Sequence, residues 1–172
     1  MLLKTKGSVK SDQVMMAEAY LRDDSMKNLS RFMHTMTLNN NYTVNLEFTS
    51  PRNRIVVPYQ EDRLTVLNVR NNETGAYLPY AVIKALMERN NCGEYLVANL
   101  VDDIEVPEDF VSSIPGIKQG EGYVCVQPNG EWFKVKNDAY VSLHRLKDSV
   151  NSPRALFGVV VNEVSDDFKA AF

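Results

Sequence analysis

The strongest constraint on the fold is a strand–turn–strand pattern between residues 122 and 136. The chain reads GYVCVQ, then PNG, then EWFKVK, so two runs suited to strands flank a tripeptide suited to a turn. Asn129 and Gly130 accept the positive φ angles that a tight hairpin turn requires. We therefore predict an antiparallel hairpin here, followed by a helix from about Asp138 to Lys147.

A strand period also marks residues 42–49, where the sequence YTVNLEFT alternates apolar and polar side chains. This alternation predicts a half-buried strand, because successive strand residues face opposite sides of a sheet. The turn SPRN follows, and then the segments NRIVVPY and RLTVLNVR, before the turn-like NNETG. The order predicts three consecutive strands in an antiparallel meander.

Helical spacing appears on either side of these strands. From Ser11, a predicted N-cap, apolar residues recur with a helical period, interrupted by a polar break at residues 23–25. They are Val14, Met15, Ala17, Ala19, Leu21, Leu29, Phe32, Met33 and Met36. We predict further helices over residues 79–89 and from about Pro153, and a loop over residues 99–120. The fold class is therefore α+β, with mostly antiparallel strands flanked by helices.

The composition fits a single globular domain over residues 1–172. With 44% hydrophobic and 24% charged residues, the chain falls outside the disordered and collagen-like classes. Cys92 and Cys125 have no Cys or His neighbour at metal-ligand spacing, which excludes a zinc ribbon. No apolar run matches a membrane span and the first ten residues carry no secretory signal, so we expect a cytoplasmic protein with no membrane partner.

The net charge of −3 hides an uneven distribution of charge along the chain. Residues 73–120 hold three Lys or Arg against eight Asp or Glu, whereas residues 1–40 hold six against four. A solvated acidic surface and an acidic docking site both explain the first of these stretches. The solvated surface is the favoured interpretation, because charge runs are usually solvated.

Two lysines on one predicted strand are the first candidate for chemistry. In EWFKVK the strand period places Trp132, Lys134 and Lys136 on one face, and Phe133 and Val135 on the other. Like charges side by side on a sheet repel each other unless solvent or an anion lies above them. A solvated exposed strand and a phosphate-binding face both remain open.

Carboxylates on neighbouring strands strengthen the second interpretation. Glu121 and Gly122 open the strand before the two lysines, and Glu47 lies on the polar face of the strand over residues 42–49. Either glutamate alone is most simply a surface residue. Strand carboxylates beside strand lysines nevertheless suit a nucleotide with a divalent metal, since lysines neutralise phosphate oxygens and a carboxylate holds the ion or the ribose hydroxyls.

A second basic segment lies at the amino terminus, where LKTKGSVKS places Lys4, Lys6 and Lys10 around a glycine. It lacks the two glycines and the Gly-Lys-Ser/Thr ending of a phosphate-binding P-loop. A flexible basic terminus is the simple alternative. His34 and His144 have no partner at metal-ligand spacing, so we interpret both as ordinary helix residues.

Taken together, these segments resemble a known superfamily. EGYVCVQPNGEWFKVKNDAYVSLH is similar to the paired late motifs of ATP-dependent nucleotidyltransferases, the ligase and capping-enzyme superfamily, with Glu-Gly in one strand and Lys-x-Lys in the next. LKTKGSVKSDQ, TVNLEFTSPRNRIVVPYQEDRLTVLNVRNNETG and YVSLHRLKDSVNSPRALF resemble, more narrowly, the RNA ligase 1 family of T-even bacteriophages. The resemblance spans nearly the whole chain and implies a partial nucleotidyltransferase (adenylyltransferase) domain.

The resemblance implies roles for individual residues. Glu47 matches the glutamate of the third motif, near the adenosine ribose, and Glu121 with Gly122 matches the fourth, whose glutamate lies near the nucleotide and the catalytic metal. Lys134 and Lys136 match the fifth motif, whose lysines contact the nucleotide phosphates. Two matches are looser: Lys6 falls in the KGS element downstream of the first motif, and Tyr140 matches a tyrosine just after the fifth.

The resemblance also implies a reaction. In such ligases a lysine attacks the α-phosphorus of ATP to form lysyl-AMP, AMP passes to an RNA 5′-phosphate, and a 3′-hydroxyl then displaces AMP. The implied cofactors are ATP and Mg²⁺, and the implied partners are RNA ends. The attacking lysine must be unprotonated, and neighbouring cations lower its pKa and stabilise the charge that develops on the phosphate.

One departure from the superfamily bears on activity. The first motif is Lys-x-Asp-Gly, whose lysine is the nucleophile, and the 172 residues contain no such tetrapeptide. KTKG at residues 4–7 is the nearest match, but it places Lys6 where the motif has aspartate. We therefore expect a partial ligase domain without the carboxy-terminal ligase domain, active with a second polypeptide that supplies the first motif. The alternative is an inactive nucleotide- or RNA-binding remnant.

Overall fold

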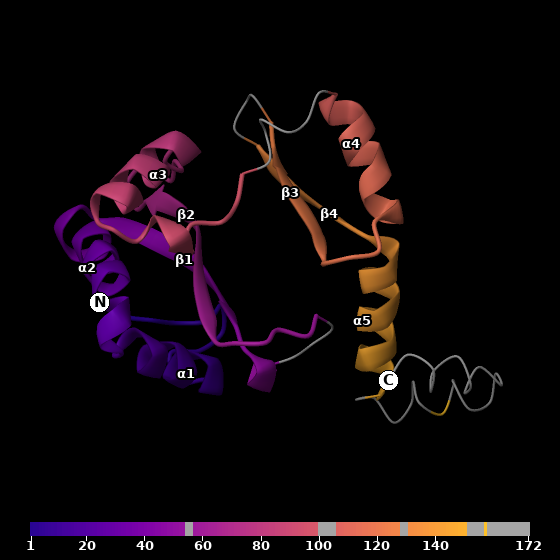
Figure 1. The fold of residues 1–172 in the computed structure, drawn as a ribbon, viewed down its shortest axis with the longest axis horizontal. Coiled ribbons are helices and arrows are strands. Elements are labelled where there is room, and N and C mark those ends of the chain that lie inside the picture. The colour runs from indigo at the N-terminus through magenta and orange to yellow at the C-terminus, as the bar shows by residue number, and fades with distance from the viewer. Residues whose placement is uncertain (54–56, 100–105, 128–130, 151–156, 158–172) are drawn as a thin grey trace. The chain divides into compact units, whose positions relative to one another are not determined.

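The computed structural model describes residues 1–53, 57–99, 106–127, 131–150 and 157 (Figure 1). The chain divides into two compact units. Unit 1 comprises Met1–Asn53 and Tyr59–Asn99, and unit 2 comprises Arg54–Pro58 and Leu100–Phe172. A single domain over residues 1–172 stays a prediction.

Unit 1 begins with two helices that follow the predicted pattern. Helix α1 spans Asp12–Leu21, and the Ser11 hydroxyl accepts a hydrogen bond from the Val14 amide at 3.4 Å, which confirms the predicted N-cap. The polar break becomes a 3₁₀ turn at Asp24–Met26, after which α2 spans Lys27–His34. A π-helical turn at Thr35–Asn39 leads into the sheet.

The sheet of unit 1 has two antiparallel strands, β1 (Tyr42–Thr49) and β2 (Arg63–Asn71). The predicted middle strand of a three-stranded meander is wrong for the described part of NRIVVPY. Residues 51–53 form a 3₁₀ turn, residues 57–59 are not in a strand, and residues 54–56 lie outside the described residues.

Local chemistry explains why the connection does not become a strand. Pro51 and Pro58 each lack the N–H group that a strand ladder needs. The Ser50 hydroxyl donates to a carboxylate oxygen of Asp62 at 2.6 Å, and Arg52 forms an ion pair with the same carboxylate. These contacts link the two ends of the connection, and β1 pairs directly with β2.

The core of unit 1 lies between the two first helices, the inner face of the sheet and α3 (Tyr80–Arg89). Its fully or nearly fully buried residues include Leu29, Phe32, Met33, Met36, Leu64, Val66, Val69, Ile83, Met87 and Cys92. The predicted helix over residues 79–89 is confirmed. In α1, however, Met15 is 56% exposed, so the prediction that it joins the apolar stripe is wrong.

The described residues of unit 2 include a hairpin, two α-helices and a 3₁₀ turn at Ile114–Gly116. Strands β3 (Gly122–Val126) and β4 (Trp132–Lys136) pair antiparallel, with Val126 opposite Trp132, and α5 spans Asp138–Val150. The predicted hairpin and the predicted start of the following helix are confirmed. The turn at Asn129 and Gly130 and nearly all of the helix predicted from Pro153 lie outside the described residues.

A helix also forms where the sequence predicted a loop. Helix α4 spans Pro107–Ser113, with Pro107 in its first turn and Glu108 and Asp109 beside it. Proline at this position loses no helical hydrogen bond, and acidic side chains stabilise the positive end of the helix dipole. The Phe110 ring then packs edge-on against the Tyr123 ring of β3, at 5.0 Å between centroids.

Among the described residues, no helix combines the length and apolarity needed to cross a membrane.

Two methionines test the core assignment with the same side chain. Met33 is 2% exposed on α2, whereas Met15 is 56% exposed on α1. We expect Met33→Ala to lower the free energy of unfolding by about 2–5 kcal/mol, because it leaves a cavity. Met15→Ala should change the same quantity by about 0.5 kcal/mol or less. Urea unfolding followed by circular dichroism measures both, and equal losses would contradict the assigned core.

Candidate functional site

A carboxylate held between two lysines lies at one end of the hairpin in unit 2. Glu121 Oε1 lies 2.8 Å from Lys134 Nζ and 3.1 Å from Lys136 Nζ. The two lysines lie two residues apart on β4 and therefore share a face, and Glu121 immediately precedes β3. We call Glu121, Lys134 and Lys136 the Glu121–lysine cluster. It brings together three of the residues predicted from the sequence.

The cluster carries one negative and two positive charges, and so retains one surplus positive charge. Partial burial raises the pKa of the Glu121 carboxyl, but the hydrogen bonds and charges of Lys134 and Lys136 together outweigh burial, so the pKa lies below its ordinary value. Glu121 is therefore ionised at neutral pH. About a third of its side chain is exposed, at 33%, so an anion in solution can reach the cluster.

Gly122 allows the close approach of Glu121 to β4. Its φ angle is +139°, a conformation that other residues rarely adopt. A Cβ atom at this position would lie 2.1 Å from the Val135 carbonyl oxygen and 2.7 Å from the Lys136 Cα. Since both contacts are with backbone, no side chain can be accommodated without opening the hairpin. The requirement for glycine in the Glu-Gly pair is therefore steric.

Asn137 is a site residue that the sequence analysis missed. It is fully buried between β4 and α5. Its side-chain amide donates to the Gly120 carbonyl at 2.8 Å and to the Gln119 carbonyl at 3.3 Å, and its side-chain oxygen accepts from the Tyr140 amide at 2.6 Å. Its backbone N–H donates to the Glu121 carbonyl at 3.1 Å.

These bonds tie the segment before β3 to the start of α5, and so fix the backbone that carries Glu121. Asn137 also serves as the N-cap of α5, because its oxygen satisfies an amide in the first turn of that helix. The signal in the sequence was an asparagine between a strand and a helix, in KVKNDAY. That signal indicates the cap but not the bonds to residues 119–121.

Tyr140 joins the cluster through Lys136. The Tyr140 side chain is buried on the first turn of α5, and Lys136 Nζ lies 5.0 Å from the centroid of its ring. A cation at this distance is attracted to the ring face. Tyr140 is therefore placed to orient the Lys136 ammonium group.

The other two predicted residues belong to unit 1. Glu47 is exposed on β1, where Thr65 of β2 lies opposite it, and the alternation of β1 turns it away from the apolar core. Lys6 is exposed in an amino-terminal turn that is closed by hydrogen bonds between Thr5 and Ser8. The structure thus brings Glu121, Gly122, Lys134, Lys136 and Tyr140 together, and describes Glu47 and Lys6 in a different unit.

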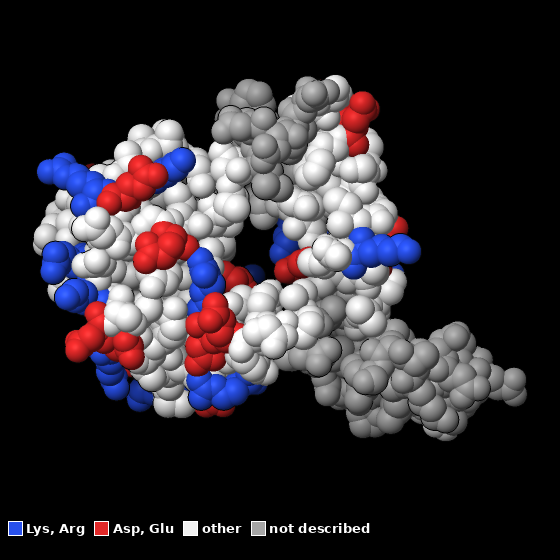
Figure 2. Space-filling view, viewed as in Figure 1, with Lys and Arg blue, Asp and Glu red and all other residues white. Residues whose placement is uncertain are grey.

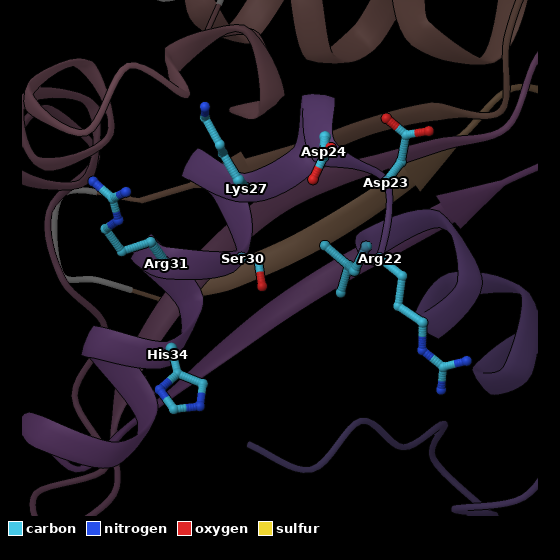
Figure 3. Close-up of a pocket in the computed structure, with 8 residues that line it drawn as sticks. Arg22, Asp23, Asp24, Lys27, Ser30, Arg31 and His34 are labelled. Carbon is cyan, nitrogen blue, oxygen red and sulfur yellow. The ribbon is translucent and has the colours of Figure 1, made fainter.

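Unit 1 also carries a hollow on its surface (Figure 3). It lies where α1 meets α2, and Lys27, Ser30, Arg31 and His34 reach it from α2. Its lining carries mixed charges, because Arg22, Asp23 and Asp24 also line it. The Arg22 side chain is paired with a residue outside the hollow, since its Nη2 lies 3.7 Å from Glu18 Oε2. Figure 2 shows the same mixture of Lys and Arg with Asp and Glu across the visible face of unit 1. We assign no chemistry to this hollow.

The donor set of the cluster suits an anion more than a preformed metal site. Within the residues that the structure describes, no group of three His, Cys, Asp or Glu side chains could hold a metal ion. Magnesium is commonly bound by one or two carboxylates together with substrate phosphates and water. A single carboxylate beside two lysines therefore fits Mg²⁺ that arrives with a nucleotide better than a metal ion held by the protein alone.

Three known proteins are similar to this chain over most of its length. The chain is 30% identical over 128 residues to a protein of Autographa californica nuclear polyhedrosis virus named as a bifunctional polynucleotide kinase/RNA ligase. It is 27% identical over 132 residues to a protein of Thermovibrio ammonificans named as an RNA ligase, and 24% identical over 160 residues to an RNA ligase of Rhodothermus phage RM378. The chain is similar to RNA ligases.

The extent of these similarities differs between the chain and its relatives. They cover 73%, 72% and 76% of this chain, but 17%, 33% and 36% of the respective relatives. The chain thus spans between about a sixth and about a third of the length of the RNA ligases that it matches. No family model matches the chain. The relatives support an RNA ligase family, without favouring the RNA ligase 1 family of T-even bacteriophages in particular.

The lysines account for the low pKa of Glu121, and this is open to measurement. We expect an NMR titration of the Glu121 carboxyl to give a pKa below 4.5, the ordinary value, and Lys134→Gln or Lys136→Gln to raise it. A depressed pKa in the folded state adds stability above about pH 4.5, which is lost as the pH falls through the lowered value. An unchanged Glu121 pKa in both variants would contradict the cluster.

The role of Asn137 can be measured separately. Asn137→Ala removes the cap of α5 and the hydrogen bonds that its amide donates to the Gln119 and Gly120 carbonyls, so we expect the free energy of unfolding to fall by about 1–3 kcal/mol. The matched control is Asn39→Ala, at an exposed asparagine of unit 1. This variant should change the free energy of unfolding by about 0.5 kcal/mol or less. Urea unfolding provides the measurement, and a loss in the control as large as in Asn137→Ala would contradict this role.

Proposed function

We propose that these 172 residues form part of an ATP-dependent RNA ligase, which joins an RNA 5′-phosphate to a 3′-hydroxyl through lysyl-AMP and RNA-adenylate intermediates. The observation that carries the proposal is the Glu121–lysine cluster, in which Lys134 and Lys136 lie 2.8 and 3.1 Å from one carboxylate oxygen. The similarity to proteins named as RNA ligases supports it. The proposal includes membership of the RNA ligase 1 family of T-even bacteriophages, which the sequence motifs suggest.

In the proposed site Lys134 and Lys136 bind the phosphate oxygens of ATP and of the RNA-adenylate. Their spacing of two residues on one strand face presents two ammonium groups to one anion. A phosphate that reaches them adds negative charge where the cluster has a positive surplus. The close approach of backbone that Gly122 permits keeps Glu121 beside both lysines as the anion arrives.

Glu121 has two functions in this proposal. It orients both lysine ammonium groups, and it is the carboxylate that holds Mg²⁺ together with the nucleotide phosphates. Bound Mg²⁺ would supply Lewis-acid stabilisation of charge on the transferring phosphate. Tyr140 orients Lys136 through the contact of the ammonium group with its ring. Glu47, near the ribose, and Lys6, near the nucleotide, are further contacts that the resemblance suggests.

The nucleophilic lysine is assigned to a partner segment, because the 172 residues contain no Lys-x-Asp-Gly tetrapeptide. In the first step its unprotonated amine forms a bond to the α-phosphorus of ATP as pyrophosphate leaves. An RNA 5′-phosphate oxygen then takes the AMP from the lysine, and the 3′-hydroxyl finally displaces AMP as it loses its proton. At each step Lys134 and Lys136 neutralise charge on the phosphate under attack.

A second candidate function follows from the same missing tetrapeptide. A chain that binds nucleotide or RNA without transferring AMP would retain the Glu121–lysine cluster and have no use for a nucleophile. The two candidates differ in the last step of the reaction. Sealing of RNA that already carries the 5′-adenylate needs no lysine nucleophile, so a ligase segment retains it and an inactive remnant does not.

The test is the sealing of pre-adenylylated RNA by the 172-residue chain with Mg²⁺. Lys134→Ala and Lys136→Ala should each slow sealing by about 10-fold to 100-fold, since a charged hydrogen bond contributes about 1.5–3 kcal/mol. The matched control is Lys84→Ala, at an exposed lysine of α3 in unit 1, which should seal at the unaltered rate. The products are separated on a denaturing gel.

Each result of this assay separates the candidates. Sealing by the unaltered chain with loss in both β4 variants supports the ligase. Sealing that is unchanged in Lys134→Ala and in Lys136→Ala contradicts the roles assigned to the cluster. No sealing by a folded chain, in the presence of a polypeptide that supplies the first motif, favours the inactive binding protein.

A further inference from the structure

The face of the hairpin that carries the two lysines also carries exposed apolar side chains. In the register of β3 with β4, Val126 lies opposite Trp132, Val124 opposite Lys134 and Gly122 opposite Lys136. Residues that lie opposite each other share a face of the sheet. Trp132 and Val126 therefore occupy the turn end of the same face whose other end holds the Glu121–lysine cluster. We call Trp132 and Val126 the apolar platform.

Both members of the apolar platform are accessible. Trp132 is 39% exposed and Val126 is 57% exposed. Tryptophan is highly buried on average, and exposed large apolar groups that adjoin one another indicate a binding surface. The surface is thus apolar at one end and cationic at the other.

The chemistry of this face matches one class of ligand. Proteins that bind single-stranded nucleic acid combine cations that contact the backbone with aromatic side chains on which bases stack. Residues two apart on a strand are separated by about 7 Å. A nucleotide whose phosphate contacts Lys134 is therefore long enough to place a base over Trp132. Asp and Glu side chains of a peptide would match the lysines, but they have no planar ring to match the tryptophan, whereas each nucleotide carries both a phosphate and a ring.

We infer that the apolar platform binds an unpaired base of the RNA strand, with Trp132 stacked on the base, while the Glu121–lysine cluster binds a neighbouring backbone phosphate. The inference rests on the proposed function for the identity of the ligand as RNA, and it assigns to Trp132 a binding role beyond phosphate chemistry. Stacking of this kind tolerates any base, because every base has a π-face. The platform therefore holds RNA near the site of sealing without selecting its sequence.

Intrinsic fluorescence tests this inference directly, because Trp132 is the one tryptophan among the 172 residues. The probes are a single-stranded oligoadenylate of about ten nucleotides and an abasic ribose-phosphate oligomer of the same length and charge. We expect the oligoadenylate to quench the tryptophan fluorescence and the abasic oligomer to leave it unchanged. ATP alone, at the same nucleotide concentration, should quench much less than the oligoadenylate.

Variants separate stacking from charge. Trp132→Ala should weaken binding of dye-labelled oligoadenylate by about 5-fold to 150-fold, the range expected from one stacked base, and leave binding of the abasic oligomer unchanged. Trp132→Phe retains a ring and should lose only a few-fold. The matched control is Phe133→Ala, because Phe133 is similarly exposed, at 38%, but lies on the opposite face of β4. It should bind oligoadenylate within about twofold of the unaltered chain.

Several outcomes would overturn the inference. They are equal quenching by the abasic oligomer, no quenching by either, and unchanged oligoadenylate binding in Trp132→Ala. Quenching by ATP as strong as by oligoadenylate would assign the platform to the cofactor instead. Equal losses in Trp132→Ala and Phe133→Ala would show that the hairpin as a whole, and not the platform, carries the effect.

The sealing assay keeps this test separate from the proposed function. A chain that seals pre-adenylylated RNA but shows no base-dependent quenching retains the ligase proposal and loses the apolar platform. A chain that shows base-dependent quenching but does not seal retains the platform as an RNA-binding surface and loses the ligase proposal.

Discussion

The contact of the Glu121 carboxylate with Lys134 and Lys136 is the constraint on which the candidate site of unit 2 depends. Two ammonium groups on one strand face repel each other, and one carboxylate oxygen lies within 3.1 Å of both. Ion pairs that are partly exposed contribute only about 1 kcal/mol or less to stability. The contact therefore matters less for holding the unit together than for fixing where two cations stand relative to one anion.

Backbone geometry makes that contact possible. Gly122 brings the start of β3 against Val135 and Lys136, at a distance that no side chain would permit. Asn137 holds the preceding segment through its amide and caps α5 with its oxygen. The cap, the glycine and the strand register act together, so the Glu121–lysine cluster is prepared before any ligand is bound. Such preorganisation is what a site for a highly charged phosphate requires.

The similarity to RNA ligases and the geometry of unit 2 support each other. Relatives named as RNA ligases match about three-quarters of this chain, at 72–76%. Independently of them, β4 presents two lysines and an exposed aromatic ring on one face. The nucleotidyl-transfer site and the surface for single-stranded RNA that we propose would thus occupy one short hairpin. The unit that carries Glu47 and Lys6 has its own apolar core.

The sequence by itself determined the elements whose signals are local. Alternation over residues 42–49, the two strand runs around residues 128–130 and the Ser11 cap each depend on neighbours within a few residues, so helices and strands of an α+β chain could be predicted. The Lys-x-Lys spacing likewise placed two lysines on one face.

Only the tertiary structure decided the rest. The described residues of one predicted strand, 53 and 57–59, lie outside any strand, and Met15 is exposed whereas Met33 is buried. The bonds of Asn137 to residues 119–121 join segments that are distant in the chain, and such contacts leave no periodic trace in the sequence.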